Sequence, residues 1–382
     1  MYVTMPTLAP LEEVNELMKG IWESGIMTHN GPLVQRFEKE VCEYLGVPQM
    51  VSCCNGTLAL QMAIKALGKQ GEIITSPFTF IATISSIMWE HCTPVFVDID
   101  PETLNIDSKK IEERITCHTV AIMPVHVFGN NCDFEAINAV AKAHHIPVIY
   151  DACHSVGSNY EGKSVFLQGD ISVTSFHATK MLNTAEGGGV FTQNKEIDEK
   201  LRRIRFFGFE NHADIVEDGF NGKMTEAHAA IGIANLRYID KALADRKEKY
   251  ARYKEILSQN SEISFQKITT GCNYSYFPAI FKDENTALRV MAALNVENIF
   301  PRRYFYPSVN TFTKLVPYIP MPMSEDVASR ILCLPLHIRM TMQDVEEIAE
   351  MTLKASHSGT TCRVCVTTTA ISPSSSMRKS MV

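Results

Sequence analysis

Short apolar segments that alternate with helical segments place the strongest constraint on the fold of this chain. Between residues 50 and 151, strand-like runs such as Ile73-Ile74-Thr75 are separated by helical patterns such as Phe134 to His144. Strands that are apolar throughout are typical of a parallel sheet whose two faces are covered by helices. The sequence therefore predicts an α/β fold with a mostly parallel sheet. In such folds, ligands bind beyond the carboxyl ends of the strands.

The pattern changes near residue 240, which predicts two domains. Residues 1–240 carry the alternation and form the predicted large domain. A long charged helix from Lys241 to Ser258 begins a predicted smaller domain, 241–355, which an amphipathic helix from Met342 to Ala355 closes. The tail, 356–382, is rich in Ser and Thr and has no packing face, so we expect it to be disordered.

Composition excludes several classes of protein. The 382 residues are 45% hydrophobic and 21% charged, as in a soluble enzyme with a large core, and the net charge of -7 gives no support for nucleic-acid binding. No apolar run reaches the ~20 residues of a membrane helix, and the first residues do not resemble a secretory signal. The 11 cysteines favour reduced thiols in the cytoplasm. The isolated pair Cys362 and Cys365 lacks a second ligand pair, so no metal site is predicted.

The tripeptide Asn55-Gly56-Thr57 follows the predicted strand Met50 to Cys54 and precedes an apolar helix from Leu58 to Leu67. A glycine and a hydroxyl residue at a helix N-terminus expose unpaired backbone N–H groups and the positive end of the helix dipole. This arrangement suits a phosphate group. A plain helix cap has the same sequence pattern, and the tripeptide alone does not separate the two interpretations.

Two further polar side chains follow predicted strands. Asp151 ends the run from Ile146, and Lys180 lies just beyond the run Ile171 to Phe176, shortly before Gly187-Gly188-Gly189. A lysine near glycines is usually a solvated surface residue. Together with a carboxylate and a phosphate site, however, it fits pyridoxal phosphate, which needs an amine for a Schiff base and an acid that keeps its pyridine nitrogen protonated.

Ordered motifs along the chain resemble those of one family. They lie between about Thr4 and Ala355 and include Thr28-His29-Asn30-Gly31-Pro32, Asn55-Gly56-Thr57-Leu58-Ala59-Leu60, Pro77-Phe78-Thr79-Phe80, Pro124-Val125-His126-Val127-Phe128-Gly129, Asp151-Ala152-Cys153-His154 and Gly219-Phe220-Asn221-Gly222-Lys223-Met224. With these motifs the chain resembles the DegT/DnrJ/EryC1/StrS family of pyridoxal-phosphate-dependent sugar aminotransferases. The resemblance implies fold type I, with a mostly parallel sheet in the large domain and a smaller α+β C-terminal domain.

The resemblance also implies catalytic roles for three residues. Lys180 matches the lysine that forms the Schiff base and later carries the substrate proton. Asp151 matches the partner of the pyridine nitrogen, and His154 lies where the family places a His or Gln near the ring and its O3′. A related branch of the family has histidine in place of this lysine and deoxygenates sugars, so Lys180 favours amino transfer.

Further residues match cofactor contacts. Gly56, Thr57 and Ser175 resemble phosphate ligands from the same subunit, and Phe80 an aromatic that stacks on the ring. Asn221 resembles a residue that reaches the phosphate in the neighbouring subunit, which implies a homodimer with shared active sites. The alternatives are a structural hydrogen bond for each polar residue and simple core packing for Phe80.

The implied substrates are a nucleotide-linked keto sugar and L-glutamate. The segments 6–13 and 21–28 resemble enzymes that aminate C4 of dTDP-4-dehydro-6-deoxyglucose for surface polysaccharide synthesis. The residues expected to bind substrate are Thr28, Asn30, His177, Arg302, Tyr304 and Tyr306. Arg302 and Arg303 could together bind a diphosphate; the alternatives are a solvated basic loop and, for His177, a structural role. Two other functions stay open: C3 amination of a 3-keto sugar, and a protein that holds pyridoxal phosphate without turnover.

Overall fold

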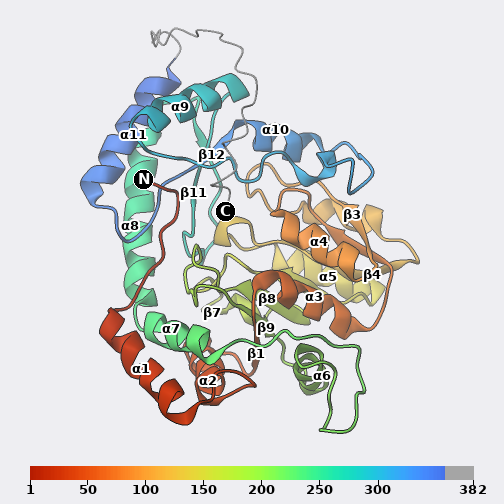
Figure 1. The fold of residues 1–382 in the computed structure, drawn as a ribbon. Helices are drawn as coiled ribbons and strands as arrows, with labels where there is room; N and C mark the ends of the chain where they lie inside the picture. The colour runs from red at the N-terminus through yellow and green to blue at the C-terminus, as the bar shows by residue number, and fades with distance from the viewer. Residues whose placement is uncertain (358–382) are drawn as a thin grey trace, which may run out of the picture.

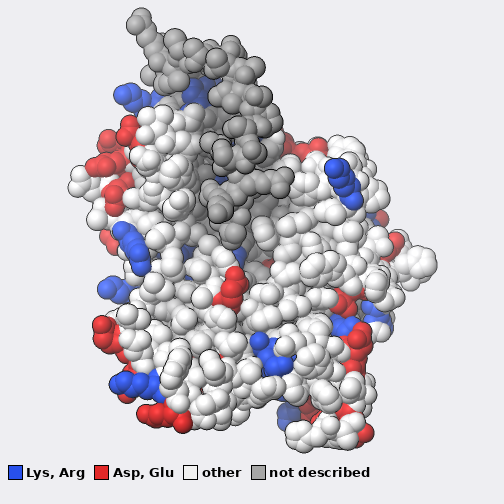
Figure 2. Space-filling view, viewed as in Figure 1, with Lys and Arg blue, Asp and Glu red and all other residues white. Residues whose placement is uncertain are grey.

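The computed structural model describes residues 1–357. The pair Cys362 and Cys365 and nearly all of the predicted tail lie outside the described residues. Within that part of the chain, no helix has the length and apolar character needed to span a bilayer. Figure 2 shows one face of the molecule, on which positive and negative side chains are interspersed.

The central sheet is mostly parallel, as predicted (Figure 1). Its strands are β1 (Met50–Cys53), β2 (Glu72–Thr75), β3 (Thr93–Phe96), β4 (Thr119–Ile122), β5 (Ile149–Asp151), β8 (Ile171–Ser175) and β9 (Gly188–Phe191). Parallel bridges from Ile122 to Val148 and from Val125 to Asp151 join the two halves, so the order is β1-β9-β8-β5-β4-β2-β3. Strand β9 runs antiparallel to both of its neighbours.

Helices cover both faces of this sheet because successive strand residues point to opposite sides. Met50 packs in one apolar cluster with Phe37, whereas Val51 packs in a second cluster with Leu60. The first cluster includes side chains from α2 (Pro32–Leu45), α5 (Phe134–His144) and α7 (Glu226–Leu236), and the second from α3 (Gly56–Leu67), α4 (Ile81–Trp89) and α6 (Lys195–Arg205). Helix α1 (Leu11–Ser24) lies beside α7.

A second sheet with its own apolar cluster follows in the chain. Strands β10 (Ser264–Phe265), β11 (Phe277–Ile280) and β12 (Ile331–Leu334) are antiparallel, and α8 (Ile239–Leu257), α9 (Glu284–Val296) and α11 (Met342–Ser356) pack with them. Helix α10 (Pro322–Arg330) precedes β12, and β6 (Asn159–Tyr160) pairs with β7 (Lys163–Ser164). Short 3-10 turns span Ser108–Lys110, Glu112–Arg114, Val127–Gly129, Val165–Leu167 and Val309–Thr311. The division near residue 240 stays a prediction.

Several predicted boundaries differ from the structure by one or more residues. The helix expected from Leu58 begins at Gly56, because the Asn55 side chain accepts a hydrogen bond from the Leu58 N–H and caps the preceding turn. Strand β11 begins only at Phe277, because the preceding Asn273 and Ser275 hydrogen-bond to the loop that contains His154.

A buried ion network anchors α2 to the edge of the central sheet. One Glu38 carboxylate oxygen accepts hydrogen bonds from the Ser52 backbone (2.9 Å) and from Arg205 (2.6 Å), and the other accepts one from Arg202 (3.0 Å). Glu38 and Arg205 are both buried. Because the network joins α2, β1 and α6, it fixes the end of α6, from which the loop with Asn221 continues.

We predict that Glu38→Ala destabilises the protein by roughly 3–5 kcal/mol, because it leaves the buried Arg205 without its carboxylate partner. On the same helix, Glu40 forms a more exposed pair with Arg36, so Glu40→Ala should cost less than about 1 kcal/mol. Chemical denaturation of both variants measures the difference. Equal losses for the two variants would contradict this role for Glu38.

Candidate active site

The N-terminus of α3 lies in direct contact with the end of β8. A Cβ atom added to Gly56 would lie 2.7 Å from the Ser175 Cβ, so any larger residue would collide with Ser175. The N–H groups of Gly56 and Thr57 belong to the first helical turn and have no acceptor within the helix. These donors, the helix dipole and the Ser175 hydroxyl form a cradle that fits a phosphate group.

Asp151 is fixed at the end of β5 by two hydrogen bonds. The Thr83 hydroxyl donates to Asp151 Oδ2 (2.8 Å), and the Cys153 backbone N–H donates to Oδ1 (3.2 Å). Asp151 is 4% exposed, and its strand, β5, is the direct neighbour of β8. Thr83 is not among the site residues expected from the sequence, because its contact with Asp151 joins positions 68 residues apart and leaves no local signal.

Lys180 lies in the loop after β8, where its surroundings favour an uncharged amine. Burial lowers the pKa of Lys180 below its usual value of 10.5, although the negative charge of Asp151 opposes the shift. A larger share of the amine is therefore neutral near physiological pH than in an exposed lysine. A neutral amine is the form that attacks a carbonyl carbon.

His154 is a neutral imidazole with a defined tautomer. Burial, and next the charge of Lys180, lower the pKa of His154 well below its usual value. Its Nδ1 accepts the Phe128 backbone N–H (3.2 Å), so the ring proton resides on Nε2. The ring stacks on Phe305 and lies 5.0 Å from the Tyr276 ring. His154 can therefore donate a hydrogen bond from Nε2 to an anionic oxygen.

Aromatic residues border this region. Burial raises the pKa of Tyr304 to about 12. The positive charge of Lys180 acts in the opposite direction and lowers the pKa of this hydroxyl. Phe80 caps α4 one turn before Thr83 and is 59% exposed, so core packing, the alternative for this residue, does not describe it. The Val309 N–H donates to the Pro77 carbonyl (3.1 Å), which joins the Tyr304 loop to the segment before Phe80.

The other residues expected to bind substrate come from three segments of the chain, near residues 30, 177 and 302–306. The Arg303 guanidinium is held by Glu284 and lies 3.4 Å from the centre of the Tyr306 ring, whereas Arg302 is exposed and has no salt bridge within residues 1–357. Of the arginine pair, Arg302 is the one left open for a ligand. Asn30 Oδ1 accepts from Arg205.

His177 lies in the same loop as Lys180, three residues before it in the chain. Its Nδ1 is 2.8 Å from the Thr179 hydroxyl, and its Nε2 is 3.8 Å from Glu186. Thr28 is half-buried in the bend that precedes α2. Asn221 is exposed on the loop after α6, where its backbone pairs with Phe206. Substrate roles for these residues stay predictions.

Comparison with known proteins identifies the family. The model for the DegT/DnrJ/EryC1/StrS aminotransferase family matches residues 10–352. The chain belongs to this family. Family members that resemble it include two proteins named dTDP-4-amino-4,6-dideoxy-D-glucose transaminase. The one from Shigella dysenteriae is 42% identical and the one from Escherichia coli 35%, and the alignments cover 91% and 92% of this chain and 96% and 97% of theirs.

A solved structure of the family supports the same conclusion for the fold. DesI, crystallised with its TDP-sugar product, superposes with a TM-score of 0.87 at 31% identity, covering 93% of this chain and 92% of DesI. The protein is therefore a pyridoxal-phosphate-dependent sugar aminotransferase with the fold type I architecture. The cradle at Gly56, the buried carboxylate of Asp151 and the amine of Lys180 fit the phosphate, the pyridine nitrogen and the aldehyde of pyridoxal phosphate. Within residues 1–357, His, Cys, Asp and Glu side chains form no group of three that could hold a metal ion.

We predict that Lys180→Ala abolishes turnover while the fold persists, because it removes the amine that binds the cofactor aldehyde. Borohydride reduction of the wild-type enzyme, followed by peptide mapping, should place the cofactor on the peptide that contains Lys180. Lys195→Ala, an exposed change at the start of α6, serves as the control and should keep full activity. Cofactor found on another lysine would show that Lys180 is the wrong residue.

Proposed function

We propose that this enzyme transfers the amino group of L-glutamate to C4 of dTDP-4-dehydro-6-deoxyglucose, which gives dTDP-4-amino-4,6-dideoxyglucose. The observation that carries the proposal is the full-length similarity to two transaminases named for this product. The surroundings of Lys180 support the proposal, because the charge of Asp151 acts to raise the pKa of Lys180 and the charge of Lys180 acts to lower that of His154.

Each residue of the site has a distinct part in this reaction. Pyridoxal phosphate, when bound, supplies the electron sink that stabilises negative charge on the carbon that carries the amine. The Asp151 carboxylate, fixed by Thr83, holds a proton on the pyridine nitrogen. Lys180 Nζ would take a proton from the donor carbon and deliver it to the cofactor, a task suited to an amine whose pKa is lowered. His154 Nε2–H would donate a hydrogen bond that helps to hold the cofactor ring.

A panel of sugar nucleotides tests the substrate. L-Glutamate should bleach the visible absorbance of the bound cofactor, and dTDP-4-dehydro-6-deoxyglucose should restore it with the highest kcat/KM of the panel. A GDP-linked 4-keto sugar and a dTDP-linked 3-keto sugar are the comparators. Preference for either comparator would overturn the assigned substrate. Cofactor that binds but is not bleached by glutamate would identify a protein without turnover.

We further propose that the enzyme works in the cytoplasm as a homodimer, supplying an amino sugar for surface polysaccharide. Large apolar side chains are exposed on α1 and on the loop after α6, including Leu11 (66%), Trp22 (71%), Phe207 (43%) and Ile215 (63%). Surfaces of this kind are commonly covered by another subunit. Asn221 lies on the same loop and is exposed, which supports its predicted reach to the partner's cofactor.

Mixed dimers test the shared site. Lys180→Ala subunits and Asn221→Ala subunits should each have little activity alone. In a mixed dimer, one site combines an intact Lys180 with an intact Asn221 from the other subunit, so activity should reappear on mixing. Sedimentation confirms that mixed dimers form. Mixed dimers without recovered activity, or a fully active monomer, would exclude the shared site.

A further inference from the structure

We propose that Lys223 is a positioning residue that orients the Asn221 amide, so that its N–H groups face the phosphate ester of the cofactor in the partner subunit. The proposal rests on the shared site described above. It adds a second residue to the subunit-crossing loop and assigns it a role that differs from direct catalysis. The ligand it serves is a phosphate monoester.

The contact between the two side chains determines which way the amide points. Lys223 Nζ donates to Asn221 Oδ1 at 2.5 Å. An ammonium group has donors and no acceptor, so of the two ends of the amide it can bind Oδ1 alone. Nδ2 must then point away from Lys223, and it has no acceptor within residues 1–357. Phosphate oxygens accept hydrogen bonds, so they need this Nδ2 orientation.

The backbone of the loop is fixed, which leaves the side-chain amide as the variable part. Asn221 forms a bridge with Phe206, and the Gly222 N–H donates to the Arg205 carbonyl (2.9 Å). The Gly222 carbonyl accepts the Cys54 N–H (3.0 Å), next to the phosphate cradle of the same chain. An otherwise exposed amide on a fixed backbone can still rotate, and the bond to Lys223 restricts this rotation.

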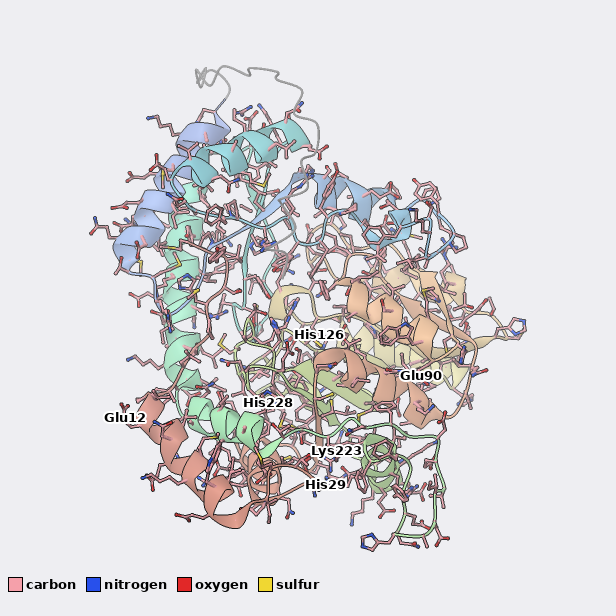
Figure 3. The ribbon with its side chains drawn as sticks, in the orientation of Figure 1. Glu12, His29, Glu90, His126, Lys223 and His228 are labelled. Carbon is pink, nitrogen blue, oxygen red and sulfur yellow. The ribbon has the colours of Figure 1, made fainter. Side chains whose placement is uncertain are left out.

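The surroundings of Lys223 leave its ammonium group free to bind Asn221 Oδ1. Within residues 1–357 it has no carboxylate partner, and Nζ lies 4.7 Å from the centre of the Phe206 ring and 4.8 Å from that of Phe207. Aromatic faces hold a cation without neutralising it. The neighbouring Arg205, in contrast, is neutralised by Glu38. Figure 3 shows Lys223 near His29, whose ring packs against Phe206.

Binding of two ligands that differ by one phosphate tests the proposal. Cofactor-free dimers of the wild type, Lys223→Met and Lys223→Arg are titrated with pyridoxamine 5′-phosphate and with pyridoxamine. Lys223→Met should weaken binding of the phosphate ester about tenfold, equivalent to about 1.4 kcal/mol, and leave pyridoxamine unchanged. Lys223→Arg should stay within about threefold of wild type, since a guanidinium also has donors alone. Lys247→Met, an exposed change on α8, is the charge-matched control and should have no effect.

A double variant separates positioning from direct contact with phosphate. If Lys223 acts through the amide, adding Lys223→Met to Asn221→Ala should weaken binding by less than about twofold further. A full tenfold loss in that background would overturn the positioning role. Equal weakening of pyridoxamine, or a lower melting temperature of the cofactor-free Lys223→Met protein, would instead show a merely structural residue and also overturn it.

Two further measurements are needed. The first asks whether Lys223 serves the phosphate of the cofactor or that of the nucleotide, and the second separates failure of the Lys223 role from failure of the shared site. Thymidine diphosphate should bind cofactor-loaded wild type and Lys223→Met equally. A loss confined to this nucleotide would assign Lys223 to the substrate and overturn the proposal. If Asn221→Ala binds pyridoxamine 5′-phosphate normally, the shared site itself fails. If Asn221→Ala weakens binding and Lys223→Met does not, the role of Lys223 alone is wrong.

Discussion

The active site depends on the close approach of two backbone segments, at Gly56 and Ser175. Strand β9 lies between β1 and β8, and a Cβ on Gly188 would be 2.4 Å from the Asn55 carbonyl. Glycines at these positions let the phosphate cradle and the Lys180 loop meet at one end of the sheet. Side chains there would separate the phosphate donors from the amine, and a cofactor of fixed length could not engage both.

The fold was largely predictable because its signals are local. The helix Phe134–His144 has the bounds that its pattern predicts, and in the structure Asp133 caps its first turn. Asp151 and Lys180 were found because each follows a strand, and parallel strands bring their carboxyl ends to one edge. The antiparallel direction of β9 was not predicted. A four-residue strand that begins with two glycines carries little pattern from which its direction could be inferred.

The remaining parts of the site depend on contacts between residues far apart in the sequence. Thr83 supports Asp151 across 68 positions, and Glu38 meets Arg205 across 167. The sequence left open whether Arg302 and Arg303 bind a diphosphate or form a solvated basic loop, and the structure shows that Glu284 holds the Arg303 guanidinium. Residue type alone did not distinguish Arg303 from Arg302, because the difference lies in which acidic side chain the fold places nearby.

Helix α8 packs in two apolar clusters, one on the central sheet and one on the second sheet. Its first turns, with Ile239 and Ala242, pack in the cluster of the central sheet, and Tyr250 and Tyr253 pack in the cluster of the second sheet. A helix of 19 residues is a stiff rod about 28 Å long at 1.5 Å per residue. A motion of the second sheet relative to the central sheet would therefore move α8 as a rigid body. Near its N-terminal end, Leu243 lies so close to Gly157, three residues beyond His154, that a Cβ there would be 2.7 Å from the leucine. Mechanical load on the second sheet would thus reach the His154 loop directly.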